Sequence, residues 1–277
     1  MRRLGQNFLT SKTIARRIAD AADIKPNDVI LEIGPGNGIL TEAILEQNPK
    51  KLIAVEKDIN LAALMKEKYY NRKSFRIIEG DILKILNTKY LILNTKYKIV
   101  ANIPYYITSH LLRLIFSQKK LPERVVLMVQ KEVAERICAK PPHMNLLALS
   151  VQVYGRPKIA FRVSHQFFKP RPRVESAVIV IDNISNNFFK SYEVQPRKIS
   201  CELEEGRFFE LLHAGFRQKR KFLLSNLKKS LFSAIPGIDG ISVNKWGKAF
   251  KKCGINEKAR AENLALEDWM CLLKLNT

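Results

Sequence analysis

Short apolar runs alternate with amphipathic segments over the first half of the chain, and this alternation restricts the fold more than any other feature. The runs that are predicted to be strands cover residues 29–33, 52–55, 75–78, 99–101 and 125–129. Helical spacing of apolar residues predicts helices at 11–23, 39–46, 61–69, 107–116 and 131–139. Strands that alternate with helices form mainly parallel sheets with helices on both faces. The sequence therefore predicts an α/β fold with a doubly wound sheet.

The periodicity changes near residue 183, which suggests a second domain. A late strand is expected at 177–181, after which polar residues dominate from Asn183 to Gly206. Beyond that stretch, apolar residues such as Phe208, Leu211 and Leu212 recur at helical spacing. We therefore expect an α/β domain at 1–182, a linker or excursion at 183–206 and a small all-helical domain at 207–277. A short repeat, Ile-Leu-Asn-Thr-Lys-Tyr, occurs twice within 85–98 and is interpreted as a loop duplication.

The chain is strongly basic, with 48 Lys and Arg against 26 Asp and Glu and a formal net charge of +22. Such a charge favours a polyanionic partner, although general basicity is an alternative. The four cysteines are far apart and form no CxxC pair, so neither a zinc site nor a disulfide framework is predicted. No apolar run is long enough for a membrane span, and the N-terminus lacks the apolar core of a secretory signal. A cytoplasmic location is expected.

Polar or glycine-rich residues follow three successive predicted strands. The first strand leads into Gly34-x-Gly36-x-Gly38, where the absence of a Cβ lets the backbone approach a ligand closely. Glu56 ends the next strand and could bind both ribose hydroxyls of a nucleoside, while Asp81 after the third could accept from an adenine amino group. For either acid alone, a solvated charge at a strand end is equally compatible. Together, the three positions predict a nucleoside-binding site.

Asn102-Ile103-Pro104-Tyr105 follows the fourth predicted strand. The Asn102 side-chain oxygen and the Pro104 carbonyl can accept the two N–H groups of an exocyclic amine, and the Tyr105 ring can stack on the base that carries it. An ordinary turn is the structural alternative, because Asn and Pro are common turn residues. Beside a nucleoside site, this tetrapeptide favours methylation of a base amine.

In chain order, these motifs resemble those of the ribosomal RNA adenine N6,N6-dimethyltransferase family, and specifically its small-subunit branch. The segment 5–9 (Gly-Gln-Asn-Phe-Leu) is similar to the family's N-terminal motif, and Glu56 and Asp81 to its ribose and adenine motifs. The resemblance implies a Rossmann-like methyltransferase sheet that binds S-adenosyl-L-methionine. The residues expected to contact this methyl donor are Asn7, Leu9, Gly34, Gly36, Glu56, Asp81 and Asn102.

The resemblance also assigns residues to the RNA. Phe168, in a motif that continues to Ala177, would close the second face of the target base beside Asn102, Pro104 and Tyr105, with core packing as the alternative. The basic residues expected to contact RNA phosphates are Arg171, Arg173, Arg217, Lys219, Arg220 and Lys221. A charge run of this kind is otherwise a solvated face.

The implied activity is dimethylation of N6 on two adjacent adenosines near the 3′ end of 16S-type rRNA. The expected partner is small-subunit rRNA within a pre-30S particle during ribosome biogenesis, with the enzyme a monomer that needs no metal or membrane. Two alternatives stay open. One is a 23S rRNA adenine methyltransferase of the antibiotic-resistance type, and the other is a non-enzymatic RNA-binding or transcription factor derived from the same fold.

Overall fold

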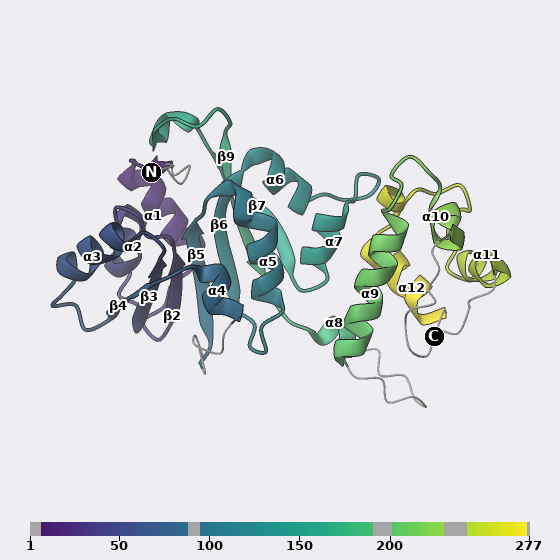
Figure 1. Ribbon diagram of the computed structural model, residues 1–277, viewed down its shortest axis with the longest axis horizontal. Helices are drawn as coiled ribbons and strands as arrows, with labels where there is room; N and C mark the ends of the chain where they lie inside the picture. Colours follow the sequence, from purple (N-terminus) through teal and green to yellow (C-terminus); the bar gives the residue numbers. More distant parts are fainter. Residues whose placement is uncertain (1–6, 88–94, 191–200, 230–242, 276–277) are drawn as a thin grey trace. The chain divides into compact units, whose positions relative to one another are not determined.

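The computed structural model describes residues 7–87, 95–190, 201–229 and 243–275 (Figure 1). The chain forms two compact units. The first comprises Met1–Glu135 and Gly155–Ile184, and the second comprises Arg136–Tyr154 and Ser185–Thr277. Within these described ranges, all the strands belong to the first unit, whereas the second is helical. The predicted combination of an α/β sheet with an all-helical part is confirmed.

The first unit is built on a seven-stranded sheet with the order β4–β3–β2–β5–β6–β9–β7. Its strands are β2 (Val29–Ile33), β3 (Lys51–Glu56), β4 (Phe75–Glu79), β5 (Tyr97–Asn102), β6 (Arg124–Gln130), β7 (Arg156–Val163) and β9 (Ser176–Asp182). Neighbours from β4 to β6 are parallel, whereas β9 is antiparallel to β6 and β7 is antiparallel to β9. A separate antiparallel pair joins β1 (Phe8–Leu9) to β8 (Phe168–Lys169). The sheet is thus mainly parallel, as predicted.

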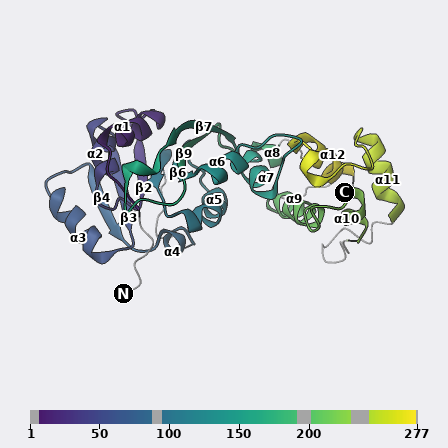
Figure 2. The same cartoon turned by 90° about the horizontal axis from the view of Figure 1, so that it is seen from above.

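Helices cover both faces of the sheet. They are α1 (Lys12–Ala21), α2 (Ile39–Glu46), α3 (Ile59–Lys68), α4 (Ile82–Asn87), α5 (Thr108–Phe116) and α6 (Lys131–Ile137), with short 3₁₀ turns η1 (Tyr105–Ile107) and η2 (His165–Phe167). Figure 2 shows α1 and α2 on one face and α4 and α5 on the other. The N-cap of α1 is Ser11, and its hydroxyl accepts the Ile14 N–H at 3.3 Å.

The core of the first unit lies between the sheet and these helices. Ile30 and Val100 of the sheet pack in one cluster with Ile18 of α1 and Ile44 of α2, and none of the four is exposed. Ile99, whose side chain points to the opposite face of the sheet, is also fully buried. Burial on both faces explains why the parallel strands are continuous apolar runs rather than alternating ones.

The second unit is a group of helices around an aromatic core. Its elements are α7 (Leu146–Gln152), α8 (Asn187–Lys190), α9 (Cys201–Gly215), α10 (Leu223–Lys229), α11 (Val243–Lys252), η3 (Ala261–Asn263) and α12 (Leu266–Leu275). Phe208, Phe250 and Trp269 have no exposed surface, and the Phe216 ring stacks on Trp269 with 5.6 Å between centroids. In the described residues, no helix is long and apolar enough to cross a bilayer.

The domain boundaries differ from the predicted ones. Residues 136–154, predicted within the 1–182 domain, pack with the second unit, where α7 contacts α9. The predicted linker at 183–206 contains α8 and the start of α9, while 191–200 lie outside the described residues. The proposed loop duplication includes the end of α4 and the start of β5, and 88–94 lie outside the described residues.

The sequence predicted no disulfide framework, whereas the structure contains a disulfide. Cys253, which follows α11, forms a disulfide with Cys271 of α12. Eighteen residues separate the two, and nothing in that spacing indicates that the two helices bring their cysteines together. The disulfide links α11 to α12 within the second unit.

A pair of glycines in α9 tests the packing of the second unit. A Cβ at Gly215 would overlap the Trp269 ring and lie 2.8 Å from Leu223 Cδ1, whereas no described atom outside the adjacent backbone of α9 lies within 4 Å of a Cβ at Gly206. Gly215→Ala should therefore lower the free energy of unfolding by about 1–3 kcal/mol. Gly206→Ala, the control on the same helix, should leave it unchanged or raise it by up to about 1 kcal/mol. Urea denaturation measures both, and equal midpoints for the two variants would contradict the packing.

Candidate active site

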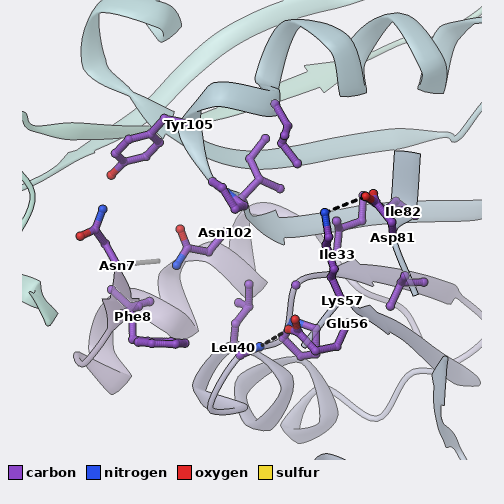
Figure 3. Close-up of a pocket in the computed structure, with 18 of the residues that line it drawn as sticks. Asn7, Phe8, Ile33, Leu40, Glu56, Lys57, Asp81, Ile82, Asn102 and Tyr105 are labelled. Atoms are coloured by element: carbon purple, nitrogen blue, oxygen red, sulfur yellow. Dashed lines mark hydrogen bonds and ion pairs between the residues drawn. The ribbon is translucent and has the colours of Figure 1, made fainter. Parts of the chain in front are cut away.

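The carboxyl ends of β2, β3, β4 and β5 surround one pocket in the first unit (Figure 3). Its lining includes every residue predicted to contact the methyl donor, namely Asn7, Leu9, Gly34, Gly36, Glu56, Asp81 and Asn102. Pro104 and Tyr105 line it as well. Over the described ranges, no group of three or more His, Cys, Asp or Glu residues is arranged to hold a metal ion. The strand-end residues predicted separately thus form a single site.

The glycine loop after β2 has the conformation that its composition predicts. Gly34 and Gly36 have φ values of +67° and +57°, which residues with a Cβ rarely adopt. A Cβ on Gly36 would also lie 3.2 Å from the Phe8 ring, which the pairing of β1 with β8 holds beside the loop. The loop and the N-terminal segment therefore form one continuous wall of the pocket.

Glu56 is 3% exposed, and backbone donors fix its carboxylate. The Gly36 N–H donates to Oε2 at 3.1 Å, and the Asp58 N–H donates to Oε1 at 2.9 Å. Each oxygen can accept one more hydrogen bond. With respect to the described residues, the carboxylate is thus oriented with one free acceptor position on each oxygen, which is what two adjacent hydroxyl groups require.

Asp81 has partners that the sequence did not predict. The Leu83 N–H donates to Oδ1 at 3.0 Å, and Lys57 Nζ lies 2.9 Å from Oδ2. Burial raises the pKa of Asp81, but hydrogen bonds from Lys57 and Leu83 outweigh it, and the pKa is lowered overall. Asp81 is therefore an ionised acceptor at neutral pH.

The tetrapeptide from Asn102 to Tyr105 lines the pocket and carries two hydrogen-bond acceptors. Asn102 is the last residue of β5, and within the part of the chain that the structure describes its side-chain amide makes no hydrogen bond. The Pro104 carbonyl accepts the Ile107 N–H at 3.2 Å, which leaves one lone pair. Figure 3 shows Asn7, Asn102 and Tyr105 grouped at one side of the pocket, opposite Lys57 and Asp81.

The Tyr105 ring is anchored through its hydroxyl group. This hydroxyl lies 2.6 Å from Oγ of Ser176, a fully buried residue at the start of β9. Burial raises the pKa of Tyr105, while the hydrogen bond with Ser176 acts in the opposite direction. Sequence reasoning missed Ser176, because a serine before an apolar strand gives no indication of a partner 71 residues away.

The structure does not bring Phe168 into the pocket. This residue is 3% exposed, packs in the same core cluster as Ile30 and does not line the pocket. This position agrees with the alternative interpretation, in which Phe168 packs in the core. Arg171 and Arg173, which follow it, are exposed.

The predicted basic run of the second unit lies in the segment between α9 and α10. Its charged residues are all exposed, namely Arg217, Lys219, Arg220 and Lys221. The next residue, Phe222, is 44% exposed. Cations beside an exposed aromatic ring could bind a polyanion, but a solvated face would have the same exposure.

Glu32, beside the glycine loop, is the most perturbed acid in the described structure. It is fully buried, its Oε2 accepts the Thr41 hydroxyl at 2.7 Å, and its Oε1 has no partner among the described residues. Burial raises the pKa of Glu32 from 4.5 to about 8; Thr41 opposes this shift, and the charge of Glu56 adds to it. Glu32 is therefore neutral at pH 7.

Solved structures place the fold in the methyltransferase class. A dimethyladenosine transferase from Plasmodium falciparum is 25% identical, with a TM-score of 0.77 over 96% of this chain and 95% of that one. A 23S rRNA methyltransferase, ErmE, is 20% identical with a TM-score of 0.71 over 97% and 99%, which shows a shared fold. The first unit is thus a Rossmann-like methyltransferase domain.

The family follows from the sequence comparisons. The model of the family described as ribosomal RNA adenine dimethylase matches residues 1–276. A ribosomal RNA small subunit methyltransferase A from Dehalococcoides mccartyi is 41% identical over 272 residues, 97% of this chain and 86% of that protein. One with the same name from Fusobacterium nucleatum is 36% identical over 276 residues, 99% and 96%. The chain belongs to the ribosomal RNA adenine dimethylase family, which confirms the predicted family and its enzymatic class.

The buried Glu32 predicts a specific dependence of stability on pH. Its pKa is higher in the folded state than in the unfolded state, so the unfolded chain binds fewer protons between pH 4.5 and about 8, and stability falls as pH rises through that window. Glu32→Gln should remove a loss on the order of 3 kcal/mol between pH 5.5 and 8.5. Denaturation of both proteins at pH 5.5 and 8.5 measures the difference. If wild type and variant lose equal stability, Glu32 does not titrate as assigned.

Proposed function

We propose that this enzyme uses S-adenosyl-L-methionine to dimethylate N6 of two adjacent adenosines near the 3′ end of small-subunit rRNA within a pre-30S particle. The observation that carries the proposal is the position of Asn102. Its amide, which makes no hydrogen bond to the described residues, lines the same pocket as Glu56 and Asp81, so that a base amine could meet a nucleoside-containing methyl donor there.

The residues of the pocket fit this donor. Glu56 offers two oriented acceptor positions for ribose hydroxyls, Asp81 offers a carboxylate for the purine amino group, and Gly36 leaves the space that a Cβ would fill. The bound donor supplies a methyl group on a sulfonium, whose leaving group is already activated. The protein's task is therefore mainly to position the nucleophile.

Asn102 and Pro104 would activate that nucleophile. The lone pair of adenine N6 is delocalised into the ring, which makes the amine a poor nucleophile. Hydrogen bonds from N6–H to the Asn102 oxygen and to the free lone pair of the Pro104 carbonyl favour a pyramidal nitrogen. These acceptors act most strongly as positive charge develops on N6, and the excess proton then leaves to water.

Tyr105 would hold the extruded base. Its hydroxyl bond to Ser176 fixes the ring beside Asn102, and stacking of a base on such a ring contributes about 1–3 kcal/mol. Phe168 was predicted to cover the second face of the base. Because this ring is buried in the core, that role would require a rearrangement of the segment around β8.

The small-subunit substrate is supported by the relatives. The proteins that match over nearly the whole chain are named ribosomal RNA small subunit methyltransferase A. ErmE, named for 23S rRNA, is similar in fold at 20% identity. Arg171, Arg173 and the basic run at 217–221 would contact phosphates, which position an enzyme on folded RNA without reading its bases. A cytoplasmic, monomeric enzyme remains the expectation.

Methyl transfer separates this function from its alternatives. Tritiated S-adenosyl-L-methionine would be incubated with the enzyme and immature 30S particles, 50S particles or free RNA, and the labelled nucleotide mapped by mass spectrometry. We expect dimethyladenosine at two adjacent positions near the 3′ end of 16S rRNA. Label on 23S rRNA alone would identify the antibiotic-resistance type, and no transfer with retained RNA binding would identify a non-enzymatic factor; either result overturns the proposal.

Asn102→Ala tests the acceptor role. The variant should lose turnover by at least about 100-fold, because an acceptor that acts mainly in the transition state is removed. Affinity for S-adenosylhomocysteine, measured by calorimetry, should remain largely in place. Asn60→Ala, at an exposed asparagine of α3, is the control that should keep full activity. Unchanged dimethyladenosine formation by Asn102→Ala would reject the role.

Replacement of Arg217, Lys219 and Arg220 with alanine tests the basic run. Fewer phosphate contacts should weaken binding to 30S particles and reduce the salt slope, d log K/d log[salt], by about 2 in magnitude. Methyl-donor affinity should not change. The matched control removes the same charge from exposed lysines of the first unit, Lys50, Lys73 and Lys119. If both triple variants have the wild-type slope, the run at 217–221 is a solvated face.

A further inference from the structure

Asp81, the carboxylate expected to accept the purine amino group of the methyl donor, already forms an ion pair with Lys57. Lys57 directly follows Glu56 at the end of β3, and Asp81 lies two residues after β4. Their side chains meet with Nζ 2.9 Å from Oδ2, and both residues line the pocket (Figure 3). The ion pair thus bridges two neighbouring strand ends where the purine of the proposed donor would lie.

The two members of this pair are held very differently. The Lys57 side chain is 55% exposed, whereas that of Asp81 is 20% exposed. The Leu83 N–H holds the other carboxylate oxygen, Oδ1, at 3.0 Å. Asp81 therefore keeps its orientation without Lys57, and the lysine is the partner that can move.

The Lys57 ammonium and a purine amino group would both donate a hydrogen bond to the same oxygen of Asp81. Both are N–H donors, and Oδ2 is the oxygen of Asp81 that no backbone group of the described residues occupies. The hydrogen bond and the charge of Asp81 raise the pKa of Lys57, so the lysine keeps its proton at every pH at which the enzyme would work. An ion pair with an exposed lysine is weak and is screened by salt. A ligand can therefore displace it at small cost.

We infer that Lys57 is a positioning residue, which acts on the donor site through Asp81. Lys57 competes with the purine amino group of the donor for this carboxylate and thereby sets the affinity for the donor. The inference rests on the proposed donor and deepens it. Affinity in the wild type then includes the cost of opening the Lys57–Asp81 pair. Salt should lower this cost, so affinity for a donor analogue without net charge should rise with ionic strength.

Calorimetry with S-adenosylhomocysteine, a zwitterion without net charge, tests the inference apart from activity. Lys57→Met keeps an unbranched stem but removes the ammonium, and it should bind the probe about two- to fivefold more tightly than wild type at low salt. The difference should shrink at high salt. Lys57→Arg keeps the charge and should behave like wild type. Lys68→Met is the matched control, because Lys68 pairs with Glu42 at 3.6 Å and does not line the pocket.

The outcomes separate this inference from the proposed function. Tighter binding by Lys57→Met alone, with wild-type affinity in Lys68→Met, supports the competition. Equal or weaker binding by Lys57→Met, when wild type binds the probe, overturns the competition and leaves the donor assignment intact. If wild type does not bind S-adenosylhomocysteine at any salt concentration, the proposed function itself is overturned.

Discussion

The site depends on the register of the parallel strands. Ile33 of β2 pairs with Val55 of β3 on one side and with Ala101 of β5 on the other. The residues that follow these three are Gly34, Glu56 and Asn102, which therefore lie side by side at one edge of the sheet. A slip of one residue in either pairing would turn the corresponding side chain to the other face of the sheet. The buried apolar residues of the strands thus fix the position of the polar ones.

This dependence explains which parts could be predicted from the sequence. The parallel strands are buried on both faces and appear as apolar runs, so their ends and the residues beyond them could be identified without a structure. The β7 strand was not predicted, because Pro157 and alternating exposed residues weaken the signal of an edge strand. The boundary of the second unit was also misplaced, because residues 136–154 precede the change in periodicity near residue 183 but pack with the second unit.

Contacts between side chains from distant parts of the chain could not be predicted. Ser176 anchors Tyr105 from 71 residues away, and Lys57 reaches Asp81 across two strand ends. The burial of Phe168 follows from the pairing of β8 with β1, a two-residue strand pair too short to have a periodic signal. Local sequence patterns show which residues end a strand. These contacts depend instead on tertiary packing, which has no local signal in the sequence.

Three acids close to one another have different tasks because their surroundings differ. Backbone N–H groups orient Glu56, a cation and a backbone N–H keep Asp81 ionised, and burial keeps Glu32 neutral. Only the first two line the pocket. The neutral Glu32 beneath the glycine loop binds Thr41 of α2 and so joins the loop's strand to the helix that follows it. The electrostatics of the site thus follow from the packing that forms it.

The most direct test of this account is a crystal structure of the enzyme with bound S-adenosylhomocysteine. The account predicts that the Glu56 carboxylate accepts both ribose hydroxyls and that the Asn102 side-chain oxygen faces the sulfur across a gap that a base amine could fill. A ligand bound elsewhere, or an Asn102 side chain turned away from the sulfur, would contradict it.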